Sequence, residues 1–564
     1  MPRTHLFGPW RRILFMSVML RRRVRAGLGG LVAAGAGLGL GELAAALVGG
    51  TSPVVGVGTQ LIDLAPGPAK DWAVKNLGTA DKPVLVGGVL FAVAIFALLA
   101  GTVGASRPRL AVVLTIGLGV LAILAAATGR TLAANPLTRL LPGVVTLIVA
   151  TVGIVLILRT LGPPPSPRAV GSAGPDETST DDARPSNPLR PARTGSAPVP
   201  TAGGSASDVP GFDRRRFLVT ALSIGAAGAA GLAVSRLVPG GVDEATRAAV
   251  KVPAPGSPAQ PLPAGVSGDV AGVSRFFTPN KSFYRVDTLL TVPKVDPRNW
   301  ELRIHGMVDR ELRLNLADLL DRHLIERDIT LTCVSNEVGG PYVGNARWIG
   351  VPIAEILREA GVQDGADAVR STSVDGLTIG TPLTALTDGR DAMFAVAMNG
   401  EPLPFAHGFP VRMVVPGLYG YVSATKWIVD FEVTRFADFS AYWTDRGWSV
   451  EAPIKTASRI DVPKGFATIK AGPAVAAGVA WAQRRGISKV EVQVDDGPWR
   501  PAKLAAEDSV DTWRQWTFRW NATPGNHKLT VRATDAEGHL QTADRAAPRP
   551  NGSSGLHNTL VMVE

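Results

Sequence analysis

The chain has a single cysteine, Cys333, among 564 residues. One thiol excludes an internal disulfide, and it excludes zinc sites that are built from several closely spaced cysteines. A small buried hydrophobe, a nucleophile and a metal ligand remain as roles for it. Cys333 ends an alternating apolar stretch and precedes a Gly-rich turn in "DITLTCVSNEVGG" (328–340). Histidine is also scarce, with seven residues, and none stands in a recognisable protease or hydrolase signature.

Acidic residues are absent from the first 25 residues, which hold seven arginines. The net charge of the chain is +11, but no Lys/Arg-rich face interleaved with aromatic residues is found elsewhere. This pattern is typical of membrane-topology signals and not of a nucleic-acid interface. We therefore expect no nucleic acid as a partner.

Four long apolar runs fill residues 1–160 and predict a four-span transmembrane region. Each run has roughly the 20 residues that cross a bilayer, and small residues in the first predict close helix packing. Glu42 is their one ionisable residue, and they hold no histidine, so a bis-histidine haem is not expected. With so few polar residues, a transporter function is disfavoured. The runs are 27–49, 83–104, 110–128 and 140–158.

Two further segments follow the predicted spans. Residues 161–213 are rich in Pro, Ser and Gly and predict a disordered linker. Residues 214–238 begin with arginines followed by Phe-Leu and an apolar run, which is typical of a twin-arginine export signal or simply of a fifth span. We favour an uncleaved fifth span that carries the signal. Arginines 21–25 predict a cytoplasmic N-terminus, so both alternatives place the rest of the chain on the extracytoplasmic side.

The remainder of the chain has soluble character. Residues 265–445 mix strand-like and helix-like runs and predict an α+β domain. The strand-like runs are 300–306, 328–333, 411–415 and 426–433, and the helix-like runs are 314–323 and 351–361. Residues 446–564 show alternating runs broken by turn signals, as in an all-β sandwich. An exposed free thiol outside the cytoplasm is prone to oxidation, so we expect Cys333 to be deeply buried or occupied.

A single thiolate suits a soft metal centre whose other ligands come from a cofactor. Such a cofactor needs donors and cations, and segment 405–427 offers them among glycines that allow close backbone approach. Arginine and lysine there suit a phosphate. The alternative is two ordinary strands with solvated charges. The candidate residues are His407, Arg412, Ser423, Thr425 and Lys426.

Several motifs resemble the sulfite oxidase family of molybdenum enzymes. "TLTCVSN" is similar to the cysteine segment of that family, and "ARWIGVPIAEIL" is similar to the segment that follows it. "MNGEPLPFAHGFPVRMVVPG" and "ATKW" resemble two later motifs in the same order. The resemblance covers about 300 residues and leaves the first 240 outside. It implies a sulfite-oxidase-type molybdopterin domain followed by an immunoglobulin-like domain, which often mediates dimerisation.

The resemblance implies a molybdopterin cofactor with Cys333 as a third sulfur ligand of molybdenum. His407, Arg412 and Lys426 would then hold the pterin and its phosphate, and Ser423 and Thr425 belong to the same segment. Other residues would line the pocket by similarity to bacterial relatives. They are Asn280, Tyr284, Arg285 and Thr372.

Two departures from the family concern the substrate. Pro279 stands where sulfite-oxidising members have an arginine, and Leu377 stands where they have a tyrosine. Both changes remove partners for a small dianion. We therefore expect oxygen-atom transfer on an S- or N-oxide or a related small molecule instead of sulfite. A true sulfite oxidase, or a catalytically silent sensor or assembly protein, is the alternative. The chain carries no cytochrome domain, so a separate electron-transfer partner is implied, as is a homodimer through the C-terminal domain.

Overall fold

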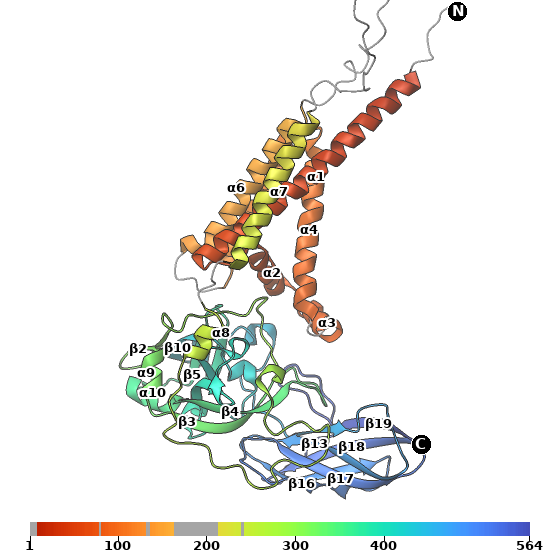
Figure 1. Cartoon of the computed structure of the whole chain (residues 1–564). Helices are drawn as coiled ribbons and strands as arrows, with labels where there is room; N and C mark the ends of the chain where they lie inside the picture. The colour runs from red at the N-terminus through yellow and green to blue at the C-terminus, as the bar shows by residue number, and fades with distance from the viewer. Residues whose placement is uncertain (1–7, 78–79, 131–135, 163–212, 238–241) are drawn as a thin grey trace, which may run out of the picture. The chain divides into compact units, whose positions relative to one another are not determined.

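The computed structural model describes residues 8–77, 80–130, 136–162, 213–237 and 242–564. The chain divides into two compact units, of which the first holds helices α1–α7 and the second holds α8 and all the strands (Figure 1). The predicted linker at 161–213 lies outside the described residues except at its ends.

The first unit is a bundle of apolar helices. Five of them are long and apolar enough to cross a membrane. The first three expected spans lie in α1, α4 and α5, the fourth lies in α6, and the fifth, expected at 214–238, corresponds to α7, which is described as far as Leu237. The sequence did not predict the shorter helices α2 and α3. The helices are α1 (Gly8–Val48), α2 (Pro53–Leu64), α3 (Gly67–Leu77), α4 (Asp81–Gly104), α5 (Pro108–Thr128), α6 (Pro136–Thr160) and α7 (Arg214–Leu237).

Glycine allows α1 to approach its neighbours closely. A Cβ atom added to Gly39 of α1 would overlap the backbone of Gly228 in α7. One added to Gly101 of α4 would overlap the backbone of Ala26 in α1. Backbone contact of this kind is how helices associate where no hydrophobic effect drives them together. The expectation of close packing from small residues is therefore confirmed.

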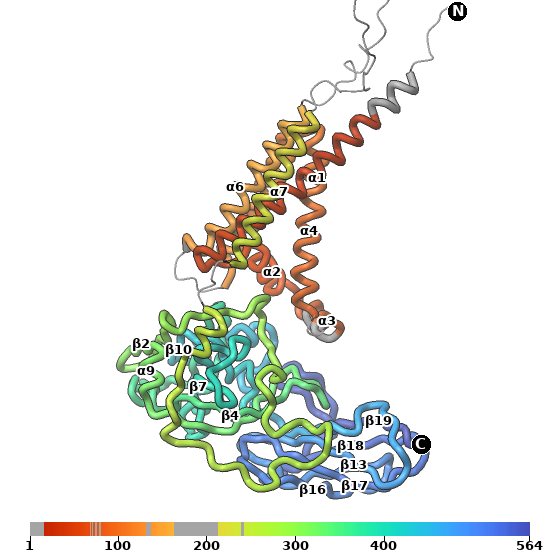
Figure 2. The backbone as a smooth tube through the Cα atoms, viewed as in Figure 1, coloured from red at the N-terminus to blue at the C-terminus, as the bar shows by residue number. Residues whose placement is uncertain are grey.

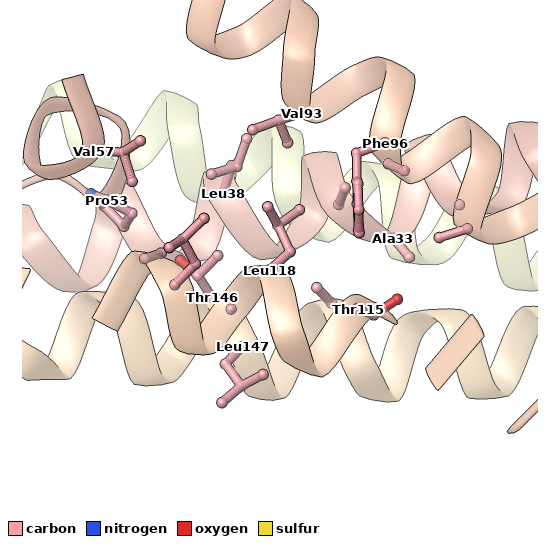
Figure 3. Close-up of a pocket in the computed structure, with 18 of the residues that line it drawn as sticks. Ala33, Leu38, Pro53, Val57, Val93, Phe96, Thr115, Leu118, Thr146 and Leu147 are labelled. Carbon is pink, nitrogen blue, oxygen red and sulfur yellow. The ribbon is translucent and has the colours of Figure 1, made fainter. Parts of the chain in front are cut away.

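The bundle encloses a cavity of about 90 Å³ between α1, α2, α4, α5 and α6 (Figure 3). Its wall is apolar except for two threonines. The Thr115 hydroxyl donates to the Ala111 carbonyl and the Thr146 hydroxyl to the Pro142 carbonyl, each at 2.9 Å within its own helix. Since both hydroxyls are engaged, the cavity presents apolar surface.

The second unit starts with two sheets. One has the order β2-β1-β10-β5-β6, in which β1 and β10 are parallel. The other has the order β3-β4-β7-β8, with β9 also paired to β7. Figure 2 shows the course of the backbone through this unit. The strands are β1 (Glu301–Gly306), β2 (Leu312–Asn315), β3 (Ile325–Thr332), β4 (Val343–Pro352), β5 (Ala368–Ser373), β6 (Thr378–Pro382), β7 (Met393–Met398), β8 (Glu401–Pro402), β9 (Arg412–Val414) and β10 (Ile428–Thr434).

Short helices accompany these sheets. Helix α8 precedes the predicted domain start at 265, yet it belongs to this unit, because the buried Arg247 forms an ion pair with Glu401 at 3.0 Å. The expected helix around 314–323 is only one turn long and begins at a capping box formed by Asn315 and Asp318. The helices are α8 (Glu244–Ala249), α9 (Leu316–Leu320), α10 (Ile353–Ala360), α11 (Thr384–Thr387), and the 3-10 turns η3 (Asn280–Ser282), η4 (Phe405–His407), η5 (Gly420–Val422), η6 (Phe436–Asp438) and η7 (Thr444–Arg446).

The C-terminal part contains two more sheets, with the orders β11-β13-β17-β16 and β12-β19-β18-β14-β15. Both contribute to one buried cluster around Trp516, Phe518 and Val531, so the region is a two-layer β structure. The strands are β11 (Ala457–Val462), β12 (Ala467–Ile469), β13 (Gly472–Trp481), β14 (Ile487–Val494), β15 (Arg500–Pro501), β16 (Lys503–Leu504), β17 (Arg514–Ala522), β18 (Gly525–Asp535) and β19 (His557–Val563).

The two parts of the second unit share buried contacts. The Trp513 indole donates to the Phe276 carbonyl at 3.0 Å. The backbone N–H of Trp513 donates to the hydroxyl of Thr330, on β3, at 2.8 Å, and the Gln483 amide donates to the Thr330 carbonyl at 3.0 Å. Because β3 leads directly to Cys333, the C-terminal sheets brace the strand that positions the cysteine.

Candidate functional site

Cys333 sits in a loop that closes on itself directly after β3. Its backbone N–H donates to the Tyr342 carbonyl at 2.9 Å. The Asn336 side chain accepts from the Tyr342 N–H at 2.8 Å, and the Asn336 N–H donates to the Cys333 carbonyl at 3.0 Å. The asparagine three residues after the cysteine therefore holds the loop that orients the thiol.

The thiol of Cys333 lies in a mostly dry environment, since the residue is 9% exposed. Its Sγ lies 3.0 Å from the Ser335 hydroxyl. Burial raises the pKa of the thiol, whereas the Ser335 contact and the charge of Lys426 lower it. The described residues contain no group of three or more His, Cys, Asp or Glu side chains that could hold a metal ion. A metal at Cys333 would therefore take its other ligands from a cofactor.

Arg412, on β9, is a buried cation without a carboxylate partner in the described part of the chain. It is 5% exposed, and burial lowers its pKa to about 10. Its guanidinium donates to the carbonyls of His407 at 3.2 Å and Met413 at 3.3 Å, and lies 5.1 Å from the Trp348 ring centre. A buried charge balanced only by carbonyls and a ring leaves room for an anion.

A second cationic group lies around Asp287. This buried carboxylate is 3.0 Å from the Lys426 ammonium and 2.9 Å from the Arg285 guanidinium. Burial lowers the pKa of Lys426 to about 8, and Asp287 acts in the opposite direction. Arg412 and Arg285 both act electrostatically on Lys426, so three cations lie close together here. Arginine and lysine side chains suit a phosphate.

His407, at the end of η4, joins this region to the first segment of the unit. Its Nε2 lies 2.9 Å from the carbonyl of Asn280, and its ring meets Phe283 edge-on at 5.6 Å. Burial and the charges of Arg412 and Lys426 lower the pKa of His407 to about 4. The imidazole is therefore neutral at pH 7, with its proton directed at the carbonyl.

The pKa of His407 predicts a loss of stability in acid. An unfolded histidine has a pKa of about 6.5, so the unfolded state binds more protons between pH 6.5 and pH 4. The free energy of unfolding should fall by about 3 kcal/mol over that window because of His407 alone. Tryptophan fluorescence can follow unfolding of the full chain in detergent at each pH, since ten of the twelve tryptophans lie beyond residue 299.

The variant His407→Gln keeps a side-chain donor but has no titrating ring, so its unfolding temperature should depend less on pH below 6.5. Burial and neighbouring cations lower the pKa of His557 to about 4 as well. The variant His557→Gln should therefore also make the unfolding temperature depend less on pH, independently of His407. The double variant should combine the two reductions. An unchanged slope in His407→Gln would contradict the prediction.

The predicted hydroxyl residues divide into two groups. The Ser423 hydroxyl donates to the Leu418 and Tyr419 carbonyls, so it stabilises its own turn. The buried Thr425 hydroxyl lies 2.6 Å from the hydroxyl of Ser371 on β5. Thr372 lies on the opposite face of β5, because adjacent strand residues point to opposite sides. The structure therefore brings Ser371, and not Thr372, to this cluster.

Tyr284 and Asn280 complete the set of predicted residues. The Tyr284 ring stacks on Phe283 at 5.2 Å, and burial raises the pKa of its hydroxyl well above the usual range, with the charge of Cys333 acting in the same direction. The amide of Asn280 donates to Glu401 at 2.6 Å and to the Met398 carbonyl at 3.1 Å. Asn280 therefore ties the first segment to the β7–β8 turn.

Sequence reasoning missed Asp287, Tyr342 and Ser371. Asp287 stands two residues after Arg285, and this short spacing of opposite charges was the available signal. Nothing local marks Tyr342 or Ser371, because each meets its partner only when distant segments come together. The charges of Cys333, Arg412 and Lys426 act on one another's surroundings, and His407 lies within reach of the same cations. This donor set fits a cofactor that brings its own metal ligands and a phosphate, and the roles of the predicted residues stay predictions.

The family comparison identifies the kind of domain in the second unit. A family model described as "Oxidoreductase molybdopterin binding domain" matches residues 289–443. The mitochondrial sulfite oxidase of Homo sapiens is 29% identical over 334 residues, which cover 50% of this chain and 60% of the relative. The chain thus spans less than two thirds of the length of this relative.

Two further similarities were found. The uncharacterized oxidoreductase YuiH of Bacillus subtilis (strain 168) is 32% identical over 153 residues, which cover 27% of this chain and 74% of the relative. Among solved structures, the sulfane dehydrogenase SoxCD from Paracoccus pantotrophus is similar with a TM-score of 0.46 and 21% identity, covering 52% of this chain and 85% of that chain.

Proposed function

The chain belongs to the family of oxidoreductases that share the molybdopterin-binding domain of the sulfite oxidases, and we propose that it transfers oxygen atoms to or from a small molecule other than sulfite. The second unit would bind molybdopterin, with Cys333 as the protein ligand of molybdenum. The expectation of a molybdenum oxidoreductase of this family is confirmed by the family match, while the substrate belongs to the proposal.

One observation carries the proposal: the lone cysteine and Arg412 are both buried and both act electrostatically on the Tyr284 hydroxyl, and Arg412 has no carboxylate partner among the described residues. A buried unpaired charge costs several kcal/mol unless an anion balances it. A cofactor that has soft metal ligands and a phosphate would satisfy both features at once.

Different residues of the site would bind different parts of the cofactor. Arg412 and Lys426 would bind its phosphate, with Asp287 keeping the Lys426 ammonium in place at 3.0 Å. His407 would offer a neutral ring, and Cys333 would give its thiolate to the metal. When bound, the cofactor supplies two-electron redox chemistry at molybdenum, whereas the protein supplies binding and orientation.

The two departures from the family pattern support a neutral substrate. Pro279 and Leu377 provide neither the cation nor the hydroxyl that a small dianion would need. In the described part of the chain, Lys426 is the cation whose charge acts on the thiol, and it is shared with Asp287. We propose an S- or N-oxide, whose reduction consumes two electrons and two protons and releases water.

The proposed membrane anchoring and topology rest on the charge and hydropathy of the first unit. The five apolar helices would anchor the chain, and the seven arginines among the first 25 residues would keep the N-terminus in the cytoplasm. The arginines at the start of α7 would act as a twin-arginine signal, so that the second unit lies outside the cytoplasm. A separate protein would exchange electrons with it.

The C-terminal two-layer β region would be immunoglobulin-like and would form a homodimer. Immunoglobulin-like domains pack two antiparallel sheets over one core. The two sheets here share one core, and all their strand pairs except β12–β19 are antiparallel, which supports the immunoglobulin-like assignment. The dimer rests on the family resemblance alone.

The proposed activity can be tested on the full chain purified in detergent from cells that synthesise molybdopterin. In one assay, reduced viologen dye donates electrons, and dimethyl sulfoxide or trimethylamine N-oxide is the substrate that accepts them. In the other assay, sulfite is the substrate that donates electrons, and ferricyanide accepts them. Reduction of either oxide without sulfite oxidation is the expected result. Sulfite oxidation would contradict the substrate class, and a metal-loaded protein that turns over none of the compounds would favour a silent protein.

A further inference from the structure

One end of the helix bundle in the first unit brings four segments of the chain together. The Arg22 guanidinium, on α1, donates to the Ala105 carbonyl, between α4 and α5, at 2.9 Å and to the Gly162 carbonyl, after α6, at 2.6 Å. Phe217, in the first turn of α7, packs against the buried cluster that contains Ala105 and Leu161. The α4–α5 turn, the end of α6 and the start of α7 therefore lie beside Arg22.

This end of the bundle is strongly basic. Eight arginines are exposed there, and none of them forms an ion pair or a side-chain hydrogen bond with any residue that the structure describes. Among the described residues within two turns of these arginines, Asp213 is the one acidic residue, and it accepts the Arg216 backbone N–H at 2.9 Å. The chain therefore leaves most of this positive charge unbalanced. We call the eight residues the arginine cluster: Arg21, Arg23, Arg107, Arg109, Arg159, Arg214, Arg215 and Arg216.

Apolar side chains continue from the arginine cluster along the outside of each helix. On α5, Arg109 is followed by Val113 and Ile116, which are 61% and 39% exposed. Residues spaced by three or four positions share one face of a helix, so the three form one stripe. Three more helices carry such a stripe of one exposed arginine and exposed apolar residues. They are Arg21, Val24 and Leu28 on α1, Arg159, Leu156 and Val152 on α6, and Arg215, Leu218 and Leu222 on α7.

We propose that the arginine cluster binds anionic phospholipids, with the headgroup phosphate at the arginines and the acyl chains along the apolar stripes. Arginine binds phosphate through a planar fork of donors. Clusters of about four to eight basic residues beside a transmembrane helix attract anionic lipids. A free phosphate would meet the arginines but not the stripes, whereas a phospholipid meets both. The stripes therefore decide for a lipid.

This lipid site goes beyond the proposed oxygen-atom transfer and does not depend on it, because binding is measured without turnover. It shares with the proposed function only the anchoring of the first unit in a membrane. Binding of a phospholipid without net charge reports that anchoring, and preference for an anionic headgroup reports the arginine cluster. The two can therefore fail separately.

The test is native mass spectrometry of the full chain in detergent, which counts bound lipids during titration. Dioleoylphosphatidylglycerol has the acyl chains and a net negative charge, dioleoylphosphatidylcholine has the same chains without net charge, and glycerol 1-phosphate has the charge without chains. We expect phosphatidylglycerol to bind at least about tenfold more tightly than either of the others. Equal affinity for the two phospholipids would overturn the proposal. Equally tight binding of glycerol 1-phosphate would assign the cluster to free phosphate, and binding of neither phospholipid would contradict the anchoring as well.

A triple variant locates the site. Arg107→Gln/Arg109→Gln/Arg159→Gln leaves the arginines at 21–25 in place and should weaken phosphatidylglycerol binding by about tenfold or more. The matched control Lys470→Gln/Lys503→Gln/Arg519→Gln removes three positive charges from exposed positions in the second unit and should leave the affinity unchanged. The same loss in both variants would mean that overall charge attracts the lipid, which overturns a specific site.

Two further measurements keep the proposal falsifiable if the triple glutamine variant does not fold. Arg107→Lys/Arg109→Lys/Arg159→Lys retains the charges and should bind phosphatidylglycerol within about threefold of the unaltered chain. Raising the salt concentration should weaken phosphatidylglycerol binding by the unaltered chain but not phosphatidylcholine binding, because exposed charges are screened. Loss of binding in the lysine variant with unchanged helix content, or an affinity for phosphatidylglycerol that does not depend on salt, would overturn the proposal.

Discussion

Replacing Cys333 with serine is expected to reduce turnover by about a hundredfold or more while the protein stays folded. Serine has nearly the same shape, and its hydroxyl can bond to Ser335 as the thiol does, so the free energy of unfolding should change by about 1 kcal/mol or less. An alcohol is a harder ligand than a thiolate and binds a soft metal centre less well. Mutation of a residue that hydrogen-bonds to a metal ligand typically lowers metal affinity or activity by about 10- to 100-fold. Loss of the ligand itself should lower activity by more than that.

Ser335→Ala is the matched control, because it removes the hydroxyl that contacts Sγ but leaves the thiol. It should retain most of the activity and alter the pH dependence of thiol reactivity in the cofactor-free protein, since the Ser335 contact lowers the pKa of Cys333. The measurement is the rate of oxide reduction together with the absorption spectrum of the bound metal. Full activity of Cys333→Ser would contradict the role of the cysteine as a metal ligand.

Arg412→Met is expected to have opposite effects on the cofactor-free and the cofactor-bound protein. Without an anion, Arg412 is a buried charge that faces carbonyls and the Trp348 ring. A hydrophobic residue of similar length should raise the free energy of unfolding of the cofactor-free protein by about 1–4 kcal/mol. With an anion in place, losing its buried cation should cost about 2–5 kcal/mol, or a 30- to 5,000-fold loss of cofactor affinity.

Two measurements test this prediction. The first is the thermal unfolding of protein made in cells that do not synthesise the cofactor. The second is the amount of pterin that the cofactor-loaded protein retains after dialysis. Arg347→Met is the control, because Arg347 binds the buried Asp328 through two contacts of 2.7 Å. It should destabilise the loaded and the empty protein alike, by about 3–5 kcal/mol. An Arg412→Met protein that is less stable when empty, yet retains its cofactor, would contradict the assignment of Arg412 to an anion.

Much of the fold was predictable because the patterns are local. Alternating runs marked β1, β3 and β10, and the apolar runs marked the five long helices. Boundaries were less predictable. Helix α1 extends back to Gly8 through the arginine-rich segment, and α2 has only 12 residues, too few to cross a bilayer. The capping box at Asn315 makes α9 begin at Leu316, and hydropathy does not register such local hydrogen bonds.

The site was predictable where one motif carries several residues. Cys333 with Asn336, and His407 with Arg412, stand in short segments whose spacing survives in the fold. The pairing of β5 was not predictable to one residue, and a shift of one residue moves a side chain to the other face of a strand. On β5 the hydroxyl that meets Thr425 belongs to Ser371, whereas Thr372 lies on the opposite face, and its place in the pocket stays a prediction.

The most direct test of the central claim is the molybdenum and pterin content of the full chain, purified from cells with intact molybdopterin synthesis. We predict about one molybdenum and one pterin per chain, both strongly reduced in Arg412→Met, with an altered metal spectrum in Cys333→Ser. A well-folded protein that contains neither metal nor pterin would contradict the account. Cys333 would then be a buried small side chain, and Arg412 a buried charge without an explanation.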